Sequence, residues 1–221
     1  MTSPYTGDVE VGGPAQVREL PGLTISKLAV SDMANNAYLL RDTASGEALL
    51  IDAAAEPEAL RTLIGDADLR TVVTTHGHWD HHRALPAVVE ANGAVTVAHA
   101  ADADDLPVPV QRTVDHGDTV TVGSQTLEVI HLRGHTPGSI ALAWRAPEDA
   151  GVHVFTGDSL FPGGVGNTQQ DAARFASLID DVEERLFGAL PDETWVYPGH
   201  GKDTTLGAER PHLGEWRERG W

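Results

Sequence analysis

The sequence predicts a mixed α/β protein built from two β-sheets with helices on their outer faces. Short runs of apolar and β-branched residues alternate with segments of helical periodicity along the whole chain. No evident linker interrupts this alternation. The chain has 221 residues, enough for one large domain with a real core, so we expect residues 1–221 to form a single domain.

The first half of the chain starts with three successive strands, predicted at residues 23–30, 36–41 and 48–52. Apolar residues at helical spacing follow Pro57 and predict a helix, because proline suits the first helical turn. A β-branched run at 70–74 predicts the next strand. After it we expect a helix that ends near Asn92-Gly93 and a strand at 95–97.

The second half repeats this style, with strands predicted at residues 119–122, 126–131, 139–144, 152–155 and 194–197. The clearest amphipathic helix has apolar residues at i, i+3, i+4, i+7 and i+11, namely Phe175, Leu178, Ile179, Val182 and Leu186. Segment 101–110 is rich in aspartate and proline, and we expect it to be a surface loop.

Composition excludes several kinds of site and partner. The chain has 33 acidic and 15 basic residues, a formal net charge of −18. A surface this acidic repels phosphate backbones and anionic membranes, so we expect neither nucleic acid nor membrane as a partner. The absence of cysteine excludes disulfides, thiolate metal ligands and a cysteine nucleophile. The segment 1–13 has no basic region or apolar run typical of a secretory signal, which favours the cytoplasm.

Residues 75–82 read Thr-His-Gly-His-Trp-Asp-His-His and carry the strongest functional signal. In an extended segment, residues at i and i+2 project to one side, so His76 and His78 can reach one metal ion. Asp80 and His81 can then turn toward a second ion. Imidazole nitrogen and carboxylate oxygen suit zinc, iron and manganese. The stretch therefore predicts a metalloenzyme.

Three further candidate ligands also follow predicted strands directly: His135, Asp158 and His200. Glycines flank each of them and permit sharp turns and close backbone approach. The four motifs, in this order over residues 75–201, resemble those of the metallo-β-lactamase fold superfamily. The resemblance implies a four-layer αβ/βα sandwich with a dinuclear site at one edge.

The resemblance also implies a ligand set for two divalent metal ions. The first ion would be held by His76, His78 and His135. The second would be held by Asp80, His81 and His200, with Asp158 bridging both. Zinc is the expected metal, with iron or manganese as alternatives, because the ligand set suits all three. Two such ions about 3.5–4 Å apart convert a bridging water into hydroxide near neutral pH, and Asp80 is the candidate catalytic residue that helps to orient it.

A histidine directly after Asp80 makes the chain resemble hydroxyacylglutathione hydrolases more than the antibiotic-hydrolysing branch. Two departures leave the thiol carrier open. Only about 20 residues follow His200, whereas that family has a further helical region there. The segment 164–167 also lacks the family's cysteine and basic residue. We therefore predict metal-dependent hydrolysis of a small-molecule thioester, ester or lactone, and the sequence leaves the oligomeric state unknown.

Two other functions remain open. Persulfide dioxygenases resemble the chain in the same motifs but use one iron, which here would be held by His78 or His76, His135 and Asp158. A non-catalytic metal-binding scaffold with this fold is the third reading. Some residues outside the ligand set are also expected to have a role: the resemblance gives Asp52 a hydrogen-bonding role under the metal site, and Trp79 is expected to form a hydrophobic wall. The aromatic end, Trp216 and Trp221, is either an interaction surface or packs on the body of the chain.

Overall fold

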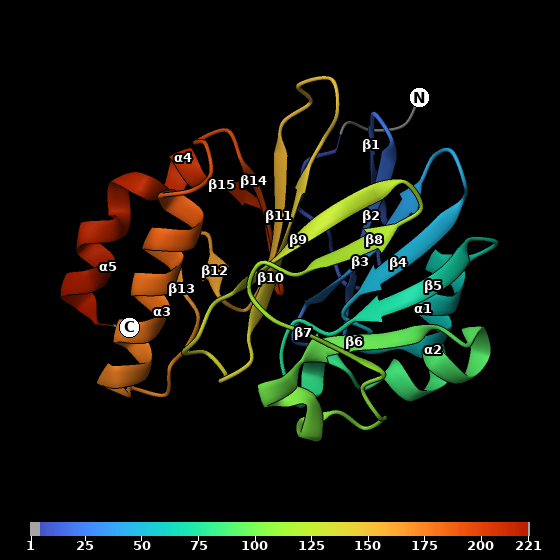
Figure 1. Cartoon of the computed structure of the whole chain (residues 1–221), viewed down its shortest axis with the longest axis horizontal. Coiled ribbons are helices and arrows are strands. Elements are labelled where there is room, and N and C mark those ends of the chain that lie inside the picture. Colours follow the sequence, from blue (N-terminus) through green and yellow to red (C-terminus); the bar gives the residue numbers. More distant parts are fainter. Residues whose placement is uncertain (1–4, 221) are drawn as a thin grey trace.

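Two large β-sheets pack face to face in the computed structural model, which describes residues 5–220 (Figure 1). The first sheet has seven strands in the order of the chain: β1 Gln16–Leu20, β2 Leu23–Val30, β3 Asn35–Asp42, β4 Glu47–Ile51, β5 Asp68–Val73, β6 Val95–His99 and β7 Arg112–Val114. Neighbours from β1 to β4 are antiparallel, and those from β4 to β7 are parallel. The parallel part places the carboxyl ends of β5, β6 and β7 at one edge of the sheet.

The second sheet has six strands in the order β15-β14-β11-β10-β9-β8. Their bounds are β8 Thr119–Val122, β9 Gln125–His131, β10 Ile140–Arg145, β11 Val152–Gly157, β14 Trp195–Pro198 and β15 Thr204–Thr205. Only β11 and β14 pair in parallel among these strands. A separate two-stranded hairpin is formed by β12 Leu160–Phe161 and β13 Gly164–Val165.

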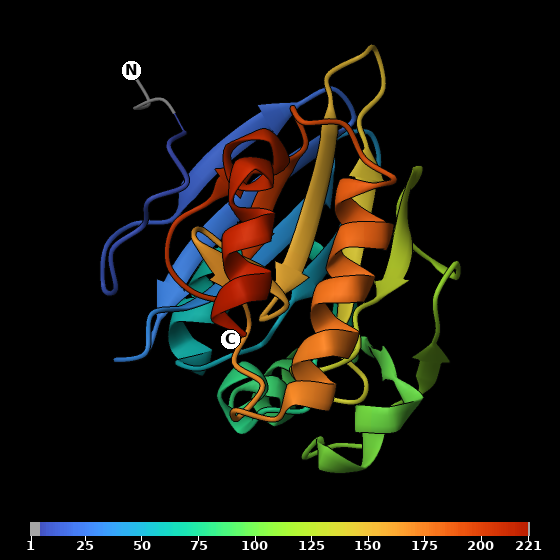
Figure 2. The ribbon, with the colours of Figure 1, turned by 90° about the vertical axis from the view of Figure 1, so that its left-hand side faces the viewer.

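Helices cover the outer face of each sheet. Two of them, α1 Pro57–Ile64 and α2 Leu85–Asn92, lie on the first sheet. The second sheet is covered by α3 Ala172–Val182, which continues into a π-helical turn at Glu183–Phe187, and by α5 Leu213–Arg219 (Figure 2). The short helix α4 Leu206–Glu209 connects β15 to this layer. Asp171 caps α3 by accepting hydrogen bonds from the backbone N–H groups of Ala173 and Arg174.

Three apolar cores separate these layers. The central core lies between the sheets and contains Leu40, Leu49, Leu142 and Phe155. A second core joins the first sheet to α1 and α2, and a third joins the second sheet to α3 and α5. The order is therefore helix, sheet, sheet, helix, and the predicted four-layer αβ/βα sandwich is confirmed.

The predicted strands and helices are all present, with ends that shift by a few residues. The prediction of a surface loop at 101–110 is wrong in part, because the 3₁₀ helix η2 Ala100–Asp105 occupies its first half and buries Asp102. Sequence patterns missed β1 and β7, which are the edge strands of the first sheet, and the two-residue strands β12, β13 and β15. Only one face of β1 is even partly buried, so its sequence lacks a strong apolar alternation.

Candidate metal centre

The loops that follow β5, β9, β11 and β14 bring all seven predicted ligands together at one edge of the sandwich. Their ligand atoms form three overlapping groups, in each of which all atoms lie within 4.8 Å of one another. The groups are His76–His78–His135, His76–His81–Asp158 and Asp80–His81–His200. The arrangement of three imidazoles in one group and a carboxylate with two imidazoles in another is suited to metal binding.

The first group consists of three imidazoles whose ring centroids are separated by 4.5–4.8 Å. Burial lowers the pKa of His76 well below its usual value and lowers the pKa of His135 to about 4. Both rings are therefore neutral near pH 7. A neutral imidazole is the form that coordinates a metal.

The second group surrounds the His200 ring. Its Nε2 lies 3.1 Å from His81 Nε2 and 3.4 Å from Asp80 Oδ2. Asn35 donates a hydrogen bond from Nδ2 to the same Asp80 oxygen at 2.9 Å. Burial alone would lower the pKa of His200, but the hydrogen bonds that its ring donates to the carboxylates of Asp158 and Asp80 raise it to about 9.

Asp158 lies between the two groups. Its Oδ1 is 3.3 Å from His81 Nε2, and its Oδ2 is 3.6 Å from His135 Nε2 and 3.4 Å from His200 Nε2. Burial would raise the pKa of this carboxyl, but the charge of His81 and hydrogen bonding by His200 hold it well below its usual value. One ionised carboxylate thus faces both groups of histidines.

Three buried atoms in this centre have no hydrogen-bond partner among the described residues: His76 Nε2, His135 Nε2 and Asp158 Oδ1. Burying an unpaired polar atom is unfavourable, so each such atom calls for an explanation. Divalent cations at these positions would satisfy all three atoms with ligands of the right type. The residues present therefore fit metal ions.

Hydrogen bonds fix which nitrogen of each ring faces the centre. His135 Nδ1 donates to the carbonyl of Asn167 at 2.8 Å, and His200 Nδ1 donates to the carbonyl of Met33 at 2.9 Å. Because each Nδ1 is hydrogen-bonded to a carbonyl, Nε2 is the nitrogen that faces the centre and that a metal ion would bind in place of a proton. Outer hydrogen bonds of this kind orient metal-binding histidines in general.

Asp52 orients the rings of His81 and His76, which agrees with its expected role under the site. Its Oδ2 accepts hydrogen bonds from His81 Nδ1 at 2.9 Å and from Thr75 Oγ1 at 2.8 Å. The Thr75 hydroxyl has one hydrogen, so it accepts from His76 Nδ1 at 3.1 Å. Asp52 is buried and therefore cannot exchange these partners for water.

Asp102 is a functional candidate that sequence reasoning missed. Its carboxylate accepts hydrogen bonds from the backbone N–H of Gly77 at 2.8 Å and of Gly138 at 2.7 Å. It also accepts one from the Thr136 hydroxyl at 2.5 Å. Asp102 thus ties the loop that carries His76 and His78 to the loop that carries His135. A Cβ at Gly138 would lie 2.7 Å from this carboxylate, so the position is restricted to glycine.

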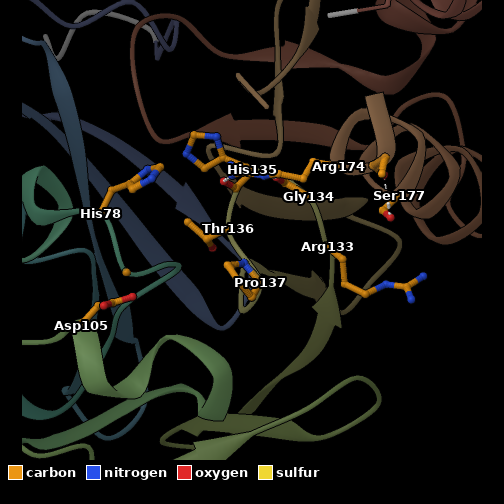
Figure 3. Close-up of a pocket in the computed structure, with 11 residues that line it drawn as sticks. His78, Asp105, Arg133, Gly134, His135, Thr136, Pro137, Arg174 and Ser177 are labelled. Atoms are coloured by element: carbon orange, nitrogen blue, oxygen red, sulfur yellow. Dashed lines mark hydrogen bonds between the residues drawn. The ribbon is translucent and has the colours of Figure 1, made fainter. Parts of the chain in front are cut away.

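A pocket of about 510 Å³ opens beside the first group of histidines (Figure 3). His78 and His135 point toward each other at one end, and Arg133 and Ser177 lie at the other. Arg174 donates hydrogen bonds to the carbonyls of Gly134 and His135, so it holds the His135 loop against α3. The Arg133 guanidinium pairs with Asp181 at 2.7–2.8 Å and is about half exposed. The pocket therefore joins the histidines to a cationic wall.

The other residues singled out in the sequence lie outside the ligand set. Trp79 is 58% exposed, and the Arg83 guanidinium lies 4.5 Å from its ring centroid. Trp216 is buried and packs edge-on against Phe187, so it belongs to the body of the chain. Trp221 lies outside the described residues. Within residues 5–220, no helix combines the length and apolar character that crossing a bilayer requires.

Comparisons with known proteins agree with this geometry. Residues 30–200 match the model of the metallo-beta-lactamase superfamily. A hydroxyacylglutathione hydrolase of Fuscovulum blasticum is 37% identical over 169 residues, which cover 75% of this chain. The match spans only 62% of the length of that relative.

Two solved structures are also similar. The crystal structure of ETHE1 from Myxococcus xanthus superposes with a TM-score of 0.73 at 32% identity and covers 88% of this chain and 84% of its own. A protein named TTHA1623, crystallised in a di-iron-bound form, has a TM-score of 0.67 at 34% identity over 83% of this chain and 96% of its own. Because the family model matches most of the chain and the ligand motifs meet in the structure, this chain belongs to the metallo-β-lactamase superfamily.

Proposed function

We propose that the chain is a metal-dependent hydrolase that cleaves a thioester, ester or lactone of a small molecule. The observation that carries the proposal is the position of Asp158, whose two oxygens face both groups of histidines. The name of the 37%-identical hydroxyacylglutathione hydrolase supports thioester cleavage. The di-iron-bound form of a 34%-identical structure supports a centre with two ions.

The first and the second ligand group would each hold one ion. His76, His78 and His135 would hold the first, and Asp80, His81 and His200 would hold the second, with Asp158 between them. When bound, two divalent ions supply an activated water nucleophile and polarise the scissile carbonyl. The metal we propose is zinc, with iron and manganese as the alternatives that the ligand set also suits.

The chain's own residues orient this chemistry. Asp80 is fixed by the Asn35 amide, which donates at 2.9 Å to Oδ2, the oxygen that lies 3.4 Å from His200 Nε2. The pocket beside His78 and His135 is the place for the substrate, because two histidines of the first ligand group line it. Its floor is held by Arg174 and Asp102, which fix the His135 loop from two sides.

Hydrolysis of a panel of small thioesters, esters and lactones by the metal-loaded protein tests the proposal. We expect turnover that is lost in His78→Ala and kept in His212→Ala, which removes an exposed histidine outside the ligand set. Full activity in His78→Ala would overturn the site assignment. One equivalent of iron with oxygen consumption on persulfides, and no hydrolysis, would replace the hydrolase by a dioxygenase.

A further inference from the structure

A second cluster of metal-binding side chains lies outside the centre described above. His99 ends β6, Asp115 directly follows β7, and His131 ends β9. One ligand atom from each lies within 4.8 Å of the other two. The cluster therefore joins two strands of the first sheet to one strand of the second.

The spacing of these atoms is close to that of a tetrahedral site. Bonds of about 2.0–2.1 Å to a tetrahedral zinc place neighbouring ligand atoms about 3.4 Å apart. Asp115 Oδ1 lies 3.5 Å from His99 Nε2 and 3.8 Å from His131 Nδ1. The two imidazole rings stack with centroids 4.0 Å apart and an angle of 26° between their planes, so both side chains must rotate for their in-plane lone pairs to converge on one ion.

His131 already has the form of a metal ligand. Its Nε2 donates a hydrogen bond to the carbonyl of Pro137 at 2.8 Å, which leaves the Nδ1 lone pair facing Asp115. A backbone carbonyl behind a ring nitrogen is the same device that orients His135 and His200. Burial lowers the pKa of His131, so the ring is neutral near pH 7.

Binding of a cation by His99 would break one hydrogen bond of its ring. Its Nδ1 accepts a hydrogen bond from the backbone N–H of Ala101 at 3.1 Å, so its hydrogen is on Nε2. Coordination through Nε2 moves that hydrogen to Nδ1 and breaks the bond to Ala101. Asp115 is largely exposed, which lets the ion enter and leaves room for a water as the fourth ligand. The lost hydrogen bond of His99 and the exposure of Asp115 to water both make metal binding weaker here than in the buried centre.

We propose that His99, Asp115 and His131 form an additional site for a divalent transition-metal ion such as Zn²⁺. Two imidazoles and one carboxylate suit zinc, nickel or copper and not magnesium, which prefers oxygen ligands. Occupancy links the two sheets. It also braces the segment 131–137, because His131 is bonded to Pro137, which lines the pocket beside His135.

The difference in bound zinc between two otherwise identical proteins tests this site. The zinc-loaded full-length chain is equilibrated with micromolar free Zn²⁺, and bound metal is measured for the wild type and Asp115→Asn. Asp115 is exposed, so the substitution leaves the fold intact. We expect the wild type to bind one equivalent more than Asp115→Asn, with affinity for that ion reduced at least about tenfold in the variant. His99→Gln with His131→Gln should give the same loss.

His116→Gln is the matched control, because it removes the exposed histidine next to Asp115 and leaves the cluster complete. It should keep the additional equivalent. Equal zinc content in wild type and Asp115→Asn would overturn the proposal, and so would an equal loss in His116→Gln. The readout is a difference of one ion, so it does not depend on how many ions the main centre holds. Ester and thioester hydrolysis by Asp115→Asn, measured in parallel, shows whether the main centre is still assembled in the variant.

Discussion

The carboxylate of Asp102 accepts a hydrogen bond from the backbone N–H of Gly77 at 2.8 Å, although 25 residues separate them in the sequence. Gly77 lies between His76 and His78, so this bond fixes the direction of both imidazoles. The other oxygen of Asp102 holds Gly138 in the loop that carries His135. One carboxylate outside the ligand set therefore positions all three histidines of the first group.

Asp102→Asn should weaken the metal centre without unfolding the protein. An amide cannot accept all three of these hydrogen bonds, so the two loops lose their common anchor. We expect metal affinity or kcat/KM to fall about 10- to 100-fold, the usual effect of changing such an outer partner. Asp104→Asn, an exposed change in the same 3₁₀ helix, should have no effect on either quantity. Equal values for the two variants would mean that Asp102 does not position the histidines.

Removal of Lys27 should strongly destabilise the fold. Its Nζ lies 2.6 Å from Asp203 Oδ1, and both side chains are fully buried. Burial lowers the pKa of Lys27 and raises that of Asp203, and their pairing opposes both shifts. Lys27→Met leaves a buried carboxylate without its cation, which costs about 3–5 kcal/mol in the free energy of unfolding. Urea titration of the purified chain measures it.

Lys202 provides the comparison for Lys27. It pairs with Asp8 at 2.8 Å, but both side chains are mostly exposed. Lys202→Met should therefore change the free energy of unfolding by less than about 1 kcal/mol. Adding Asp203→Asn to Lys27→Met should restore part of the loss, because no charge is then left buried. A small effect of Lys27→Met alone would contradict the assigned role of the pair.

Acid should destabilise the protein partly through Asp42. Burial would raise the pKa of this carboxyl, but hydrogen bonds from Ser45 and Ser124 hold it well below its usual value. A carboxyl with a lower pKa in the folded than in the unfolded state stabilises the fold above the unfolded pKa of about 3.9. This contribution is lost as the pH falls below about 4. Asp42→Asn should reduce the free energy of unfolding by about 1–3 kcal/mol at pH 7 and flatten its decline in acid. An unchanged slope between pH 5 and 3 would exclude Asp42 as a source of acid sensitivity.

The sequence could predict that these seven side chains meet, because the four motifs of the family resemblance each follow a predicted strand. It could not predict Asp102, because its partners come from loops distant in the sequence and its neighbours are acidic and look solvated. Lys27 did carry a signal, since it shares a strand face with Leu23 and Ile25 and so points inward. That residues 1–221 form a single domain stays a prediction. The metal-ligand role of each of the seven candidate residues also stays a prediction.

The metal content of purified protein tests the central claim most directly. After dialysis in metal-free buffer, elemental mass spectrometry should find about two divalent ions per chain in the wild type. Asp158→Asn should retain fewer, because the carboxylate between the two histidine groups is lost. A wild-type chain that retains no metal even after supplementation, or an Asp158→Asn chain that retains as much as the wild type, would contradict a dinuclear centre bridged by Asp158.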